Sequence, residues 1–161
     1  MSGVRWLPFA LGIGSNLGMR SSLMSMGMSM LAATERIRGL RRSGFERTDP
    51  VLPLGEPSSH PPYLNAVAIG ETGLDAGALM SRLLAIETAL GRRRGEGCRP
   101  RTLDLDLLLF GDRRIDQPGL RVPHPRFMER SFVTRPLRDL LDEVSSEPIW
   151  RPFRPYVEDV D

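Results

Sequence analysis

Hydrophobic and polar positions alternate along this chain with two different periods. Short apolar runs bounded by turn residues predict strands over residues 6–14, 39–47, 63–72 and 102–110. Apolar residues at helical spacing predict a helix over 20–34, and another that Asp75 caps and that runs to about Leu90. Strands that alternate with helices are typical of a layered α/β domain.

The second half of the chain continues this pattern less regularly. Gly111 and Asp112 predict a turn, a short return strand is expected over 113–122, and one or two helices are expected beyond it. Residues 145–161 are rich in proline and are expected to form a tail. A chain of 161 residues fits one domain, which we expect to span residues 1–161.

The predicted strand 102–110 places two aspartates within a run of leucines. Because side chains alternate along a strand, one face carries Leu103, Leu105, Leu107 and Leu109, and the other carries Thr102, Asp104, Asp106, Leu108 and Phe110. Both faces are apolar toward the end of the strand, so we expect it to be central in its sheet. The Cα atoms of the two aspartates are expected to lie about 7 Å apart.

Two carboxylates at this spacing need a cation, because they repel each other and are costly to bury. Salt bridges to Arg99 and Arg101 would supply one kind of cation. A magnesium site would supply another, since Mg²⁺ binds a few carboxylates together with substrate phosphates. The residues alone leave both interpretations open. The magnesium site would favour phosphoryl transfer as the chemistry.

Composition narrows the class of protein. Cys98 is the only cysteine, which excludes an intrachain disulfide and a cysteine-based zinc site. Hydrophobic residues make up 40% of the chain, and no apolar run approaches the roughly 20 residues that a membrane helix requires. The opening apolar stretch is not followed by a signal-peptide cleavage site. We therefore expect a cytoplasmic protein.

The basic residues are unusual in kind, because all 22 of them are arginine and the net charge is only +2. Five of them gather in one predicted loop: Arg92, Arg93, Arg94, Arg99 and Arg101. A planar guanidinium binds phosphate oxygens well, so this loop is a candidate anion site. A solvated basic loop is the simpler interpretation of the same pattern.

Four sequence segments occur in order along most of the chain, from about residue 9 to about residue 141. They are "IGSNLG" at 13–18, "YLNAV" at 63–67, "PRTLDLDLLLFG" at 100–111, and "VPHPR" followed by "ERSF" at 122–132. Together they resemble the 6-hydroxymethyl-7,8-dihydropterin pyrophosphokinase family of folate biosynthesis. The resemblance implies a ferredoxin-like α/β (α+β) fold, with an antiparallel-rich sheet between helices. It also implies transfer of pyrophosphate from ATP to the pterin hydroxymethyl group, with release of AMP.

The resemblance implies roles for residues on the ATP side of the site. Asp104 and Asp106 would bind two Mg²⁺ ions that bridge the triphosphate. Three arginines match catalytic residues beside these ions and in a loop of the family, namely Arg92, Arg94 and Arg101. The residues implied to bind ATP are Glu87, Arg94, Arg101, Leu107, His124 and Arg130. Without the resemblance, Glu87 would fit a solvated acid at a helix end, and His124 a structural histidine beside prolines.

The pterin side has its own implied residues. Two aromatic rings would enclose the flat pterin, Tyr63 and Phe132, and the amide of Asn65 would pair with its polar edge. Thr48 and Val51 match the loop that closes over the pterin. A lone aromatic residue at the start of a strand, such as Tyr63, is by itself more typical of a core.

The chain departs from the family in the arginine-rich loop and leaves two alternatives. Gly97, Cys98 and Arg99 replace a stretch that commonly holds a bulky aromatic residue, which puts loop closure and turnover in doubt. One alternative is a paralogue that binds the ligands with impaired catalysis. The other is a nucleic-acid-binding module, which the scattered aromatic residues disfavour. We expect a monomer that binds ATP and the pterin, with no nucleic-acid or membrane partner.

Overall fold

Five strands form the main sheet in this computed structural model, which describes residues 3–15, 20–48, 62–91 and 103–161. They are β1 (Leu7–Ser15), β2 (Ile37–Arg42), β3 (Glu46–Thr48), β4 (Tyr63–Thr72) and β5 (Asp104–Phe110). The strand order is β2-β4-β1-β5, with β3 paired to the beginning of β4. These strands pair antiparallel throughout.

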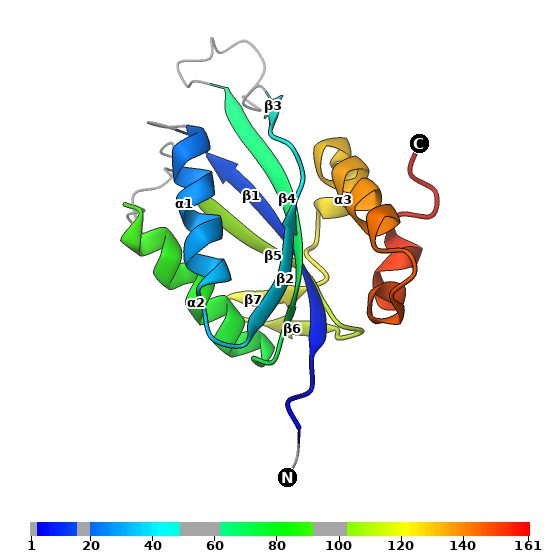
Figure 1. Cartoon of the computed structure of the whole chain (residues 1–161). Helices are drawn as coiled ribbons and strands as arrows, with labels where there is room; N and C mark the ends of the chain where they lie inside the picture. Colours follow the sequence, from blue (N-terminus) through cyan, green and yellow to red (C-terminus); the bar gives the residue numbers. More distant parts are fainter. Residues whose placement is uncertain (1–2, 16–19, 49–61, 92–102) are drawn as a thin grey trace.

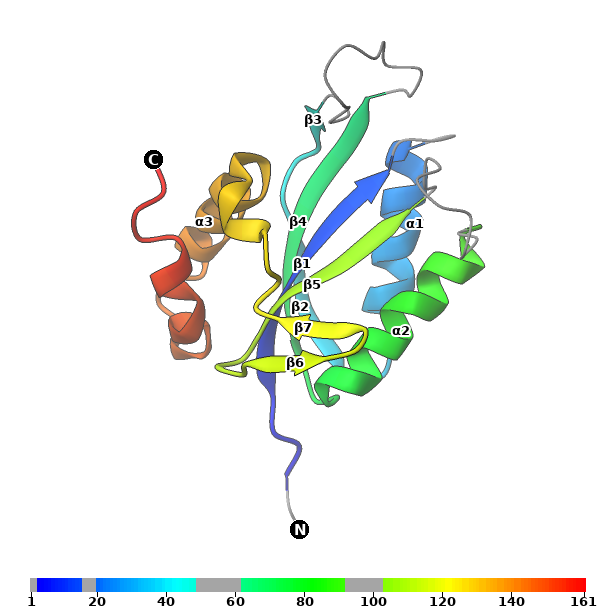
Figure 2. The same ribbon diagram turned by 180° about the vertical axis from the view of Figure 1, so that it is seen from behind.

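Helices cover both faces of this sheet (Figures 1 and 2). One face carries α1 (Arg20–Ala32) and α2 (Ala76–Ala89), and the other carries α3 (Ser131–Glu143) with the 3₁₀ helices η1 (Phe127–Glu129) and η2 (Pro148–Tyr156). The succession β1-α1-β2-β4-α2-β5 with this strand order is the ferredoxin-like arrangement, which confirms the predicted fold class. Within the described ranges, no helix is long and apolar enough to cross a membrane.

Local sequence signals account for several element boundaries. Helix α2 begins directly after Asp75, whose side chain accepts a hydrogen bond from the Ala78 N–H at 2.7 Å and confirms the predicted cap. The helix then buries Leu79, Leu83 and Ile86 along one stripe. Strand β4 has the predicted bounds, because turn residues flank a nearly continuous apolar run.

Two hydrophobic cores lie on opposite faces of the sheet. The first, between the sheet and helices α1 and α2, contains Phe9, Leu11, Leu79 and Leu105 among its buried residues. The second, between the sheet and helix α3, contains Ala10, Val67, Leu137 and Phe153. Strand β1 contributes alternate residues to both cores, which explains why its apolar run is almost unbroken.

The predicted central position of β5 is wrong, because β5 is the last strand in the order of the main sheet. Its outer edge is covered in another way. Helix α2 and the hairpin of β6 (Ile115–Gln117) and β7 (Leu120–Val122) lie beside it. This cover buries residues 107–110, and that half of the strand therefore has an apolar sequence on both faces.

A β-bulge changes the alternation of side chains in β5. Leu107 pairs with Leu11 and Leu109 pairs with Ala10, so Leu108 is an extra residue on this strand. The predicted alternation is correct from Leu103 to Leu108 and wrong beyond it, and Thr102 lies outside the described residues. Leu109 joins the second core, and Phe110 joins the first.

Three further segments differ from the sequence prediction. The predicted strand 39–47 is divided into β2 and β3, and the predicted return strand 113–122 is a two-stranded hairpin. Residues 145–161, expected as a tail, contain η2, whose Trp150 and Phe153 are buried in the second core. The C-terminal segment is therefore part of the packed structure.

Candidate active site

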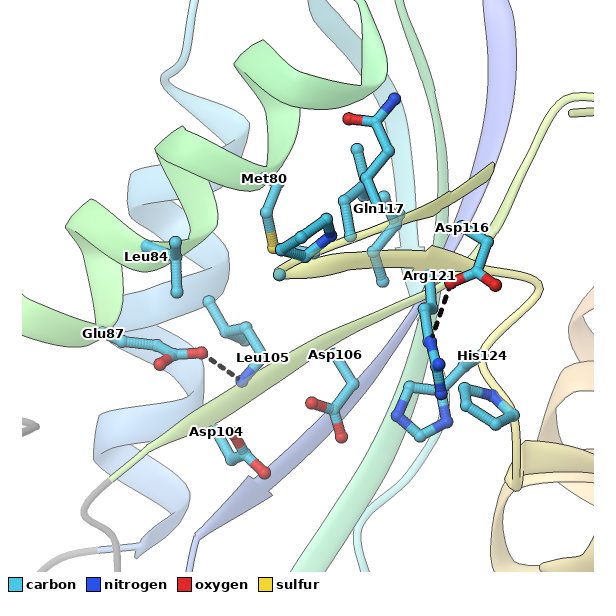
Figure 3. Close-up of a pocket in the computed structure, with 15 residues that line it drawn as sticks. Met80, Leu84, Glu87, Asp104, Leu105, Asp106, Asp116, Gln117, Arg121 and His124 are labelled. Carbon is cyan, nitrogen blue, oxygen red and sulfur yellow. Dashed lines mark hydrogen bonds and ion pairs between the residues drawn. The ribbon is translucent and has the colours of Figure 1, made fainter. Parts of the chain in front are cut away.

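A pocket of about 720 Å³ opens at the outer edge of β5 (Figure 3). Helix α2 forms one wall with Met80, Leu84 and Glu87, and the β6–β7 hairpin forms the opposite wall with residues 116–121. Residues 104–107 of β5 form its base, and His124 and Pro125 complete the lining. The structure thus brings five predicted site residues into one pocket: Glu87, Asp104, Asp106, Leu107 and His124.

Glu87 connects helix α2 to the acidic strand. Its side chain is only 2% exposed, and its Oε1 accepts a hydrogen bond from the backbone N–H of Leu105 at 3.0 Å. This N–H belongs to the residue between Asp104 and Asp106, on the edge of β5 that no strand of the main sheet pairs with. A buried donor without a partner would cost about 1–3 kcal/mol, so Glu87 stabilises the backbone that presents the two aspartates.

The bulge in β5 helps to hold His124. The His124 backbone N–H donates to the carbonyl of Leu108, the extra residue, at 2.9 Å. The Arg126 backbone N–H lies 3.5 Å from His124 Nδ1, which favours the proton of a neutral imidazole on Nε2. In that tautomer, Nε2–H is a hydrogen-bond donor.

The surroundings of His124 favour its neutral form. Burial lowers the pKa of His124 below 6.5, and Arg130 lowers it further, whereas Asp104 opposes the shift. Arg130 does not line the pocket as described, but it lies close enough to act on His124 by charge. Two of the six predicted ATP-binding residues, His124 and Arg130, therefore lie within electrostatic range of each other, and Asp104 also acts on His124.

Two glycines of β1, Gly12 and Gly14, lie between the predicted ATP side of the site on β5 and the predicted pterin side on β4. Because they have no side chains, they leave a stretch of bare backbone, called here the glycine floor. Gly14 pairs with Asp104 on one side and with Asn65 on the other, and Gly12 pairs with Asp106. Directly paired residues share a face, so Asn65 and Asp104 lie on the same side of the sheet, about 10 Å apart. A Cβ atom on Gly14 would lie 3.5 Å from Asn65 Oδ1 and would occupy this floor.

The predicted pterin residues lie along β3, β4 and α3. Asn65 Nδ2 donates to Thr48 Oγ1 at 2.6 Å, and Thr48 pairs with Tyr63 in the sheet. Phe132 belongs to α3, which covers the face shared by Tyr63 and Asn65, and it packs against the second core. These four residues do not line the pocket at β5 as described. The glycine floor of β1 separates these four residues from the pocket at β5.

Several predicted site residues lie outside the described ranges. These are Val51, Arg92, Arg94 and Arg101. Arg99, proposed with Arg101 as a salt-bridge partner of the aspartates, lies outside them as well. The choice between arginines and metal at the acidic pair is therefore not decided by the described contacts.

The sequence prediction missed two charged residues of the pocket, Asp116 and Arg121. They are directly opposed across the β6–β7 hairpin and form an ion pair at 3.0 Å. A signal was present, because Pro118 and Gly119 are turn residues that separate two short extended segments. Because residues 113–122 were predicted as one strand, the turn was not recognised, nor was the pairing of Asp116 with Arg121 across it.

The fold and the site define a ferredoxin-like protein with an acidic pocket at the edge of its sheet. A family model for 7,8-dihydro-6-hydroxymethylpterin-pyrophosphokinase matches residues 10–142, and the chain belongs to this family.

Similar curated proteins carry the name 2-amino-4-hydroxy-6-hydroxymethyldihydropteridine pyrophosphokinase. The one from Pseudomonas putida is 41% identical over 114 residues, which cover 71% of this chain and 91% of that protein. The one from Bacillus subtilis is 34% identical over 137 residues, or 85% of this chain and 80% of that protein. For the Synechocystis protein the values are 36% over 130 residues, 81% of this chain and 64% of that protein.

Proposed function

We propose that the chain transfers pyrophosphate from ATP to the hydroxymethyl group of 6-hydroxymethyl-7,8-dihydropterin, releases AMP, and thereby acts in folate synthesis. Family membership and the names of the relatives support this activity. One structural observation supports its assignment to a particular place. The acidic pair of β5 and the amide of Asn65 face the same side of the sheet across the bare backbone of Gly14.

This arrangement suits a reaction between two bound substrates. The hydroxymethyl oxygen forms a bond to the β-phosphorus of ATP, and the bond from that phosphorus to the α,β-bridging oxygen breaks. The bridging oxygen leaves with AMP, and the hydroxyl proton passes to water. Holding both reactants in line can supply much of the rate enhancement. A floor of backbone lets the hydroxymethyl group and the triphosphate approach each other without an intervening side chain.

Asp104 and Asp106 fit Mg²⁺ that arrives with the triphosphate. The described residues include no group of three histidine, cysteine or acidic side chains that could hold a metal ion. Two carboxylates are a partial ligand set, and Mg²⁺ ordinarily completes such a set with water and phosphate oxygens. When bound, the ions neutralise negative charge on the phosphates. We propose that the pair holds two ions in this way.

The remaining predicted residues divide between the two substrates. On the ATP side, His124 Nε2–H and Arg130 would donate to phosphate oxygens, Leu107 would contact the nucleotide, and Glu87 would hold the strand that carries the aspartates. Arg92, Arg94 and Arg101 would meet phosphate charge during transfer. On the pterin side, Asn65 would pair with the polar edge, oriented by Thr48. Tyr63 and Phe132 would cover the ring faces, and Val51 would close over them.

The test is an assay of the whole chain with ATP, Mg²⁺ and the hydroxymethyl dihydropterin, in which AMP and the pterin diphosphate are both measured. We expect the two products in equal amounts. Formation of no AMP above a control containing a chelator would contradict the proposed activity. Binding of both substrates without AMP would identify the impaired paralogue instead.

The metal role of the acidic pair has a specific prediction. Asp106→Asn should lower turnover by about 100-fold or more, because a neutral amide is a poor Mg²⁺ ligand beside the triphosphate. The matched control is Asp112→Asn, in the exposed turn that follows β5, which should leave turnover unchanged. Circular dichroism should show both variants folded. Full activity of a folded Asp106→Asn variant would refute the metal role.

A further inference from the structure

The charges that line the described pocket do not match a polyphosphate by themselves. Four carboxylates line it, those of Glu87, Asp104, Asp106 and Asp116. Among the described lining residues, Arg121 is the only one with a permanent positive charge. Arg121 is therefore the described lining residue best suited by charge to bind a phosphate, although the sequence analysis predicted no role for it.

The hairpin fixes where Arg121 begins and what it contacts. Pro118 and Gly119 form the two-residue turn, and Gly119 adopts φ +78°, which favours glycine. Asp116 and Arg121 are paired across the strands, so their side chains share one face of the hairpin. Both line the pocket, on the opposite side from Glu87 (Figure 3).

The ion pair itself is weak and exchangeable. Arg121 Nε donates to Asp116 Oδ1 at 3.0 Å, but the side chains are 64% and 81% exposed. Pairs as exposed as this contribute about 0–1 kcal/mol, because water screens them. A phosphate group is a stronger partner for a guanidinium, with shorter charge-assisted bonds that are often bidentate.

We propose that Arg121 is a nucleotide-binding residue that exchanges its bond to Asp116 for one to the polyphosphate of ATP. Asp116 then has two effects. It holds the guanidinium at the pocket wall before ATP binds, and it competes with the phosphate for that guanidinium. This inference rests on the proposed function, since it concerns the same pocket and the same substrate.

If Arg121 exchanges Asp116 for the polyphosphate, substitutions at these two residues should change the affinity for ATP in opposite directions. Arg121→Ala should weaken binding of ATP about tenfold or more, since a charge-assisted contact is lost. Asp116→Asn should strengthen binding about two- to fivefold, because the competing carboxylate is removed. That gain should shrink in the double variant, where no guanidinium remains to be released. A pair that only stabilised the hairpin would instead give two losses of the same sign.

The experiment measures binding and kinetics separately. Titration calorimetry with Mg²⁺ and α,β-methylene-ATP, whose α,β-linkage cannot be cleaved, gives dissociation constants for wild type, both single variants and the double variant. Steady-state assays should show a raised KM for ATP in Arg121→Ala, with kcat and the KM for the pterin little changed. The matched control is Arg113→Ala, an exposed arginine beside the same hairpin that pairs with Asp112 and is not among the described pocket residues.

Two results would overturn the inference. One is an Arg121→Ala dissociation constant within twofold of wild type. The other is a similar loss of affinity in both single variants, accompanied by a lowered melting temperature. Failure of the wild-type protein to bind the nucleotide at all would contradict the proposed function instead, so the two failures are distinguishable.

Discussion

His124 is the residue whose charge depends most clearly on its surroundings. Burial and Arg130 favour the neutral imidazole, and Asp104 favours the charged one. Between the lowered pKa of folded His124 and 6.5, the unfolded chain binds more protons at this position. The free energy of unfolding therefore falls as the pH is lowered through this window, and His124→Gln should remove that part of the pH dependence.

A bound polyphosphate should reverse the shift at this residue. Its negative charge favours the imidazolium, so we expect the pKa of His124 to rise when Mg²⁺ and α,β-methylene-ATP bind. NMR titration of the two histidines of the chain, with and without nucleotide, measures this directly. An unchanged His124 titration in a protein shown to bind the nucleotide would contradict its place beside the phosphates.

At the scale of elements, β1 shows how a strand can build a site by omitting side chains. Gly12 and Gly14 face the acidic residues, while Phe9, Leu11 and Ile13 on the opposite face enter the first core. The strand is therefore anchored on one side and has no side chains at Gly12 and Gly14 on the other, where Ala10 alone joins the second core. At this end of β1, packing and the proposed function depend on different faces of the same backbone.

Gly14→Ala tests this division. Its new methyl group would meet Asn65 Oδ1 at 3.5 Å, an ordinary contact, so we expect only a small change in unfolding free energy. Turnover should fall about tenfold or more, because the methyl group occupies space between the substrates. Gly70→Ala gives the opposite contrast, since its Cβ would approach the Phe9 ring to 2.7 Å within the first core. That variant should lose stability in urea unfolding and keep the KM values of wild type.

The C-terminal 3₁₀ helix η2 is part of the second core. Its residue Phe153 is fully buried in the second core, which also holds α3, the helix that carries Phe132. Phe153→Ala should lower the free energy of unfolding by about 3–5 kcal/mol through lost burial and a new cavity. Arg151→Ala, an exposed position of η2, should change it by less than about 0.5 kcal/mol. Equal stability of the two variants would show that η2 does not contribute to the core.

For the whole molecule, the sequence predicted the bounds of individual elements better than it predicted how those elements pack against one another. The bounds of β4 and the cap at Asp75 follow from neighbouring residues, and sequence analysis identified both correctly. The edge position of β5 was missed because cover by a helix and a hairpin produces the same apolar pattern as cover by strands. Periodicity cannot distinguish these two kinds of cover.

The same distinction applies to the candidate site. Alternation placed Asp104 and Asp106 on one face, because that relation lies within a single strand. The bond from Glu87 to Leu105 and the pairing of Asp116 with Arg121 join separate elements. The family resemblance pointed to Glu87, but its contact with the strand backbone required the three-dimensional arrangement.

The extra residue in β5 has a consequence for how this strand tolerates change. At Leu108 the alternation of side chains shifts by one residue, between the part of the strand that carries the aspartates and the part that fills the cores. Deleting Leu108 would leave Leu107, Leu109 and Phe110 opposite the same residues of β1, so the acidic pair and the core residues would keep their faces. The deletion would remove the carbonyl that accepts from the His124 backbone N–H, so the extra residue serves the placement of His124 rather than the packing of the strand.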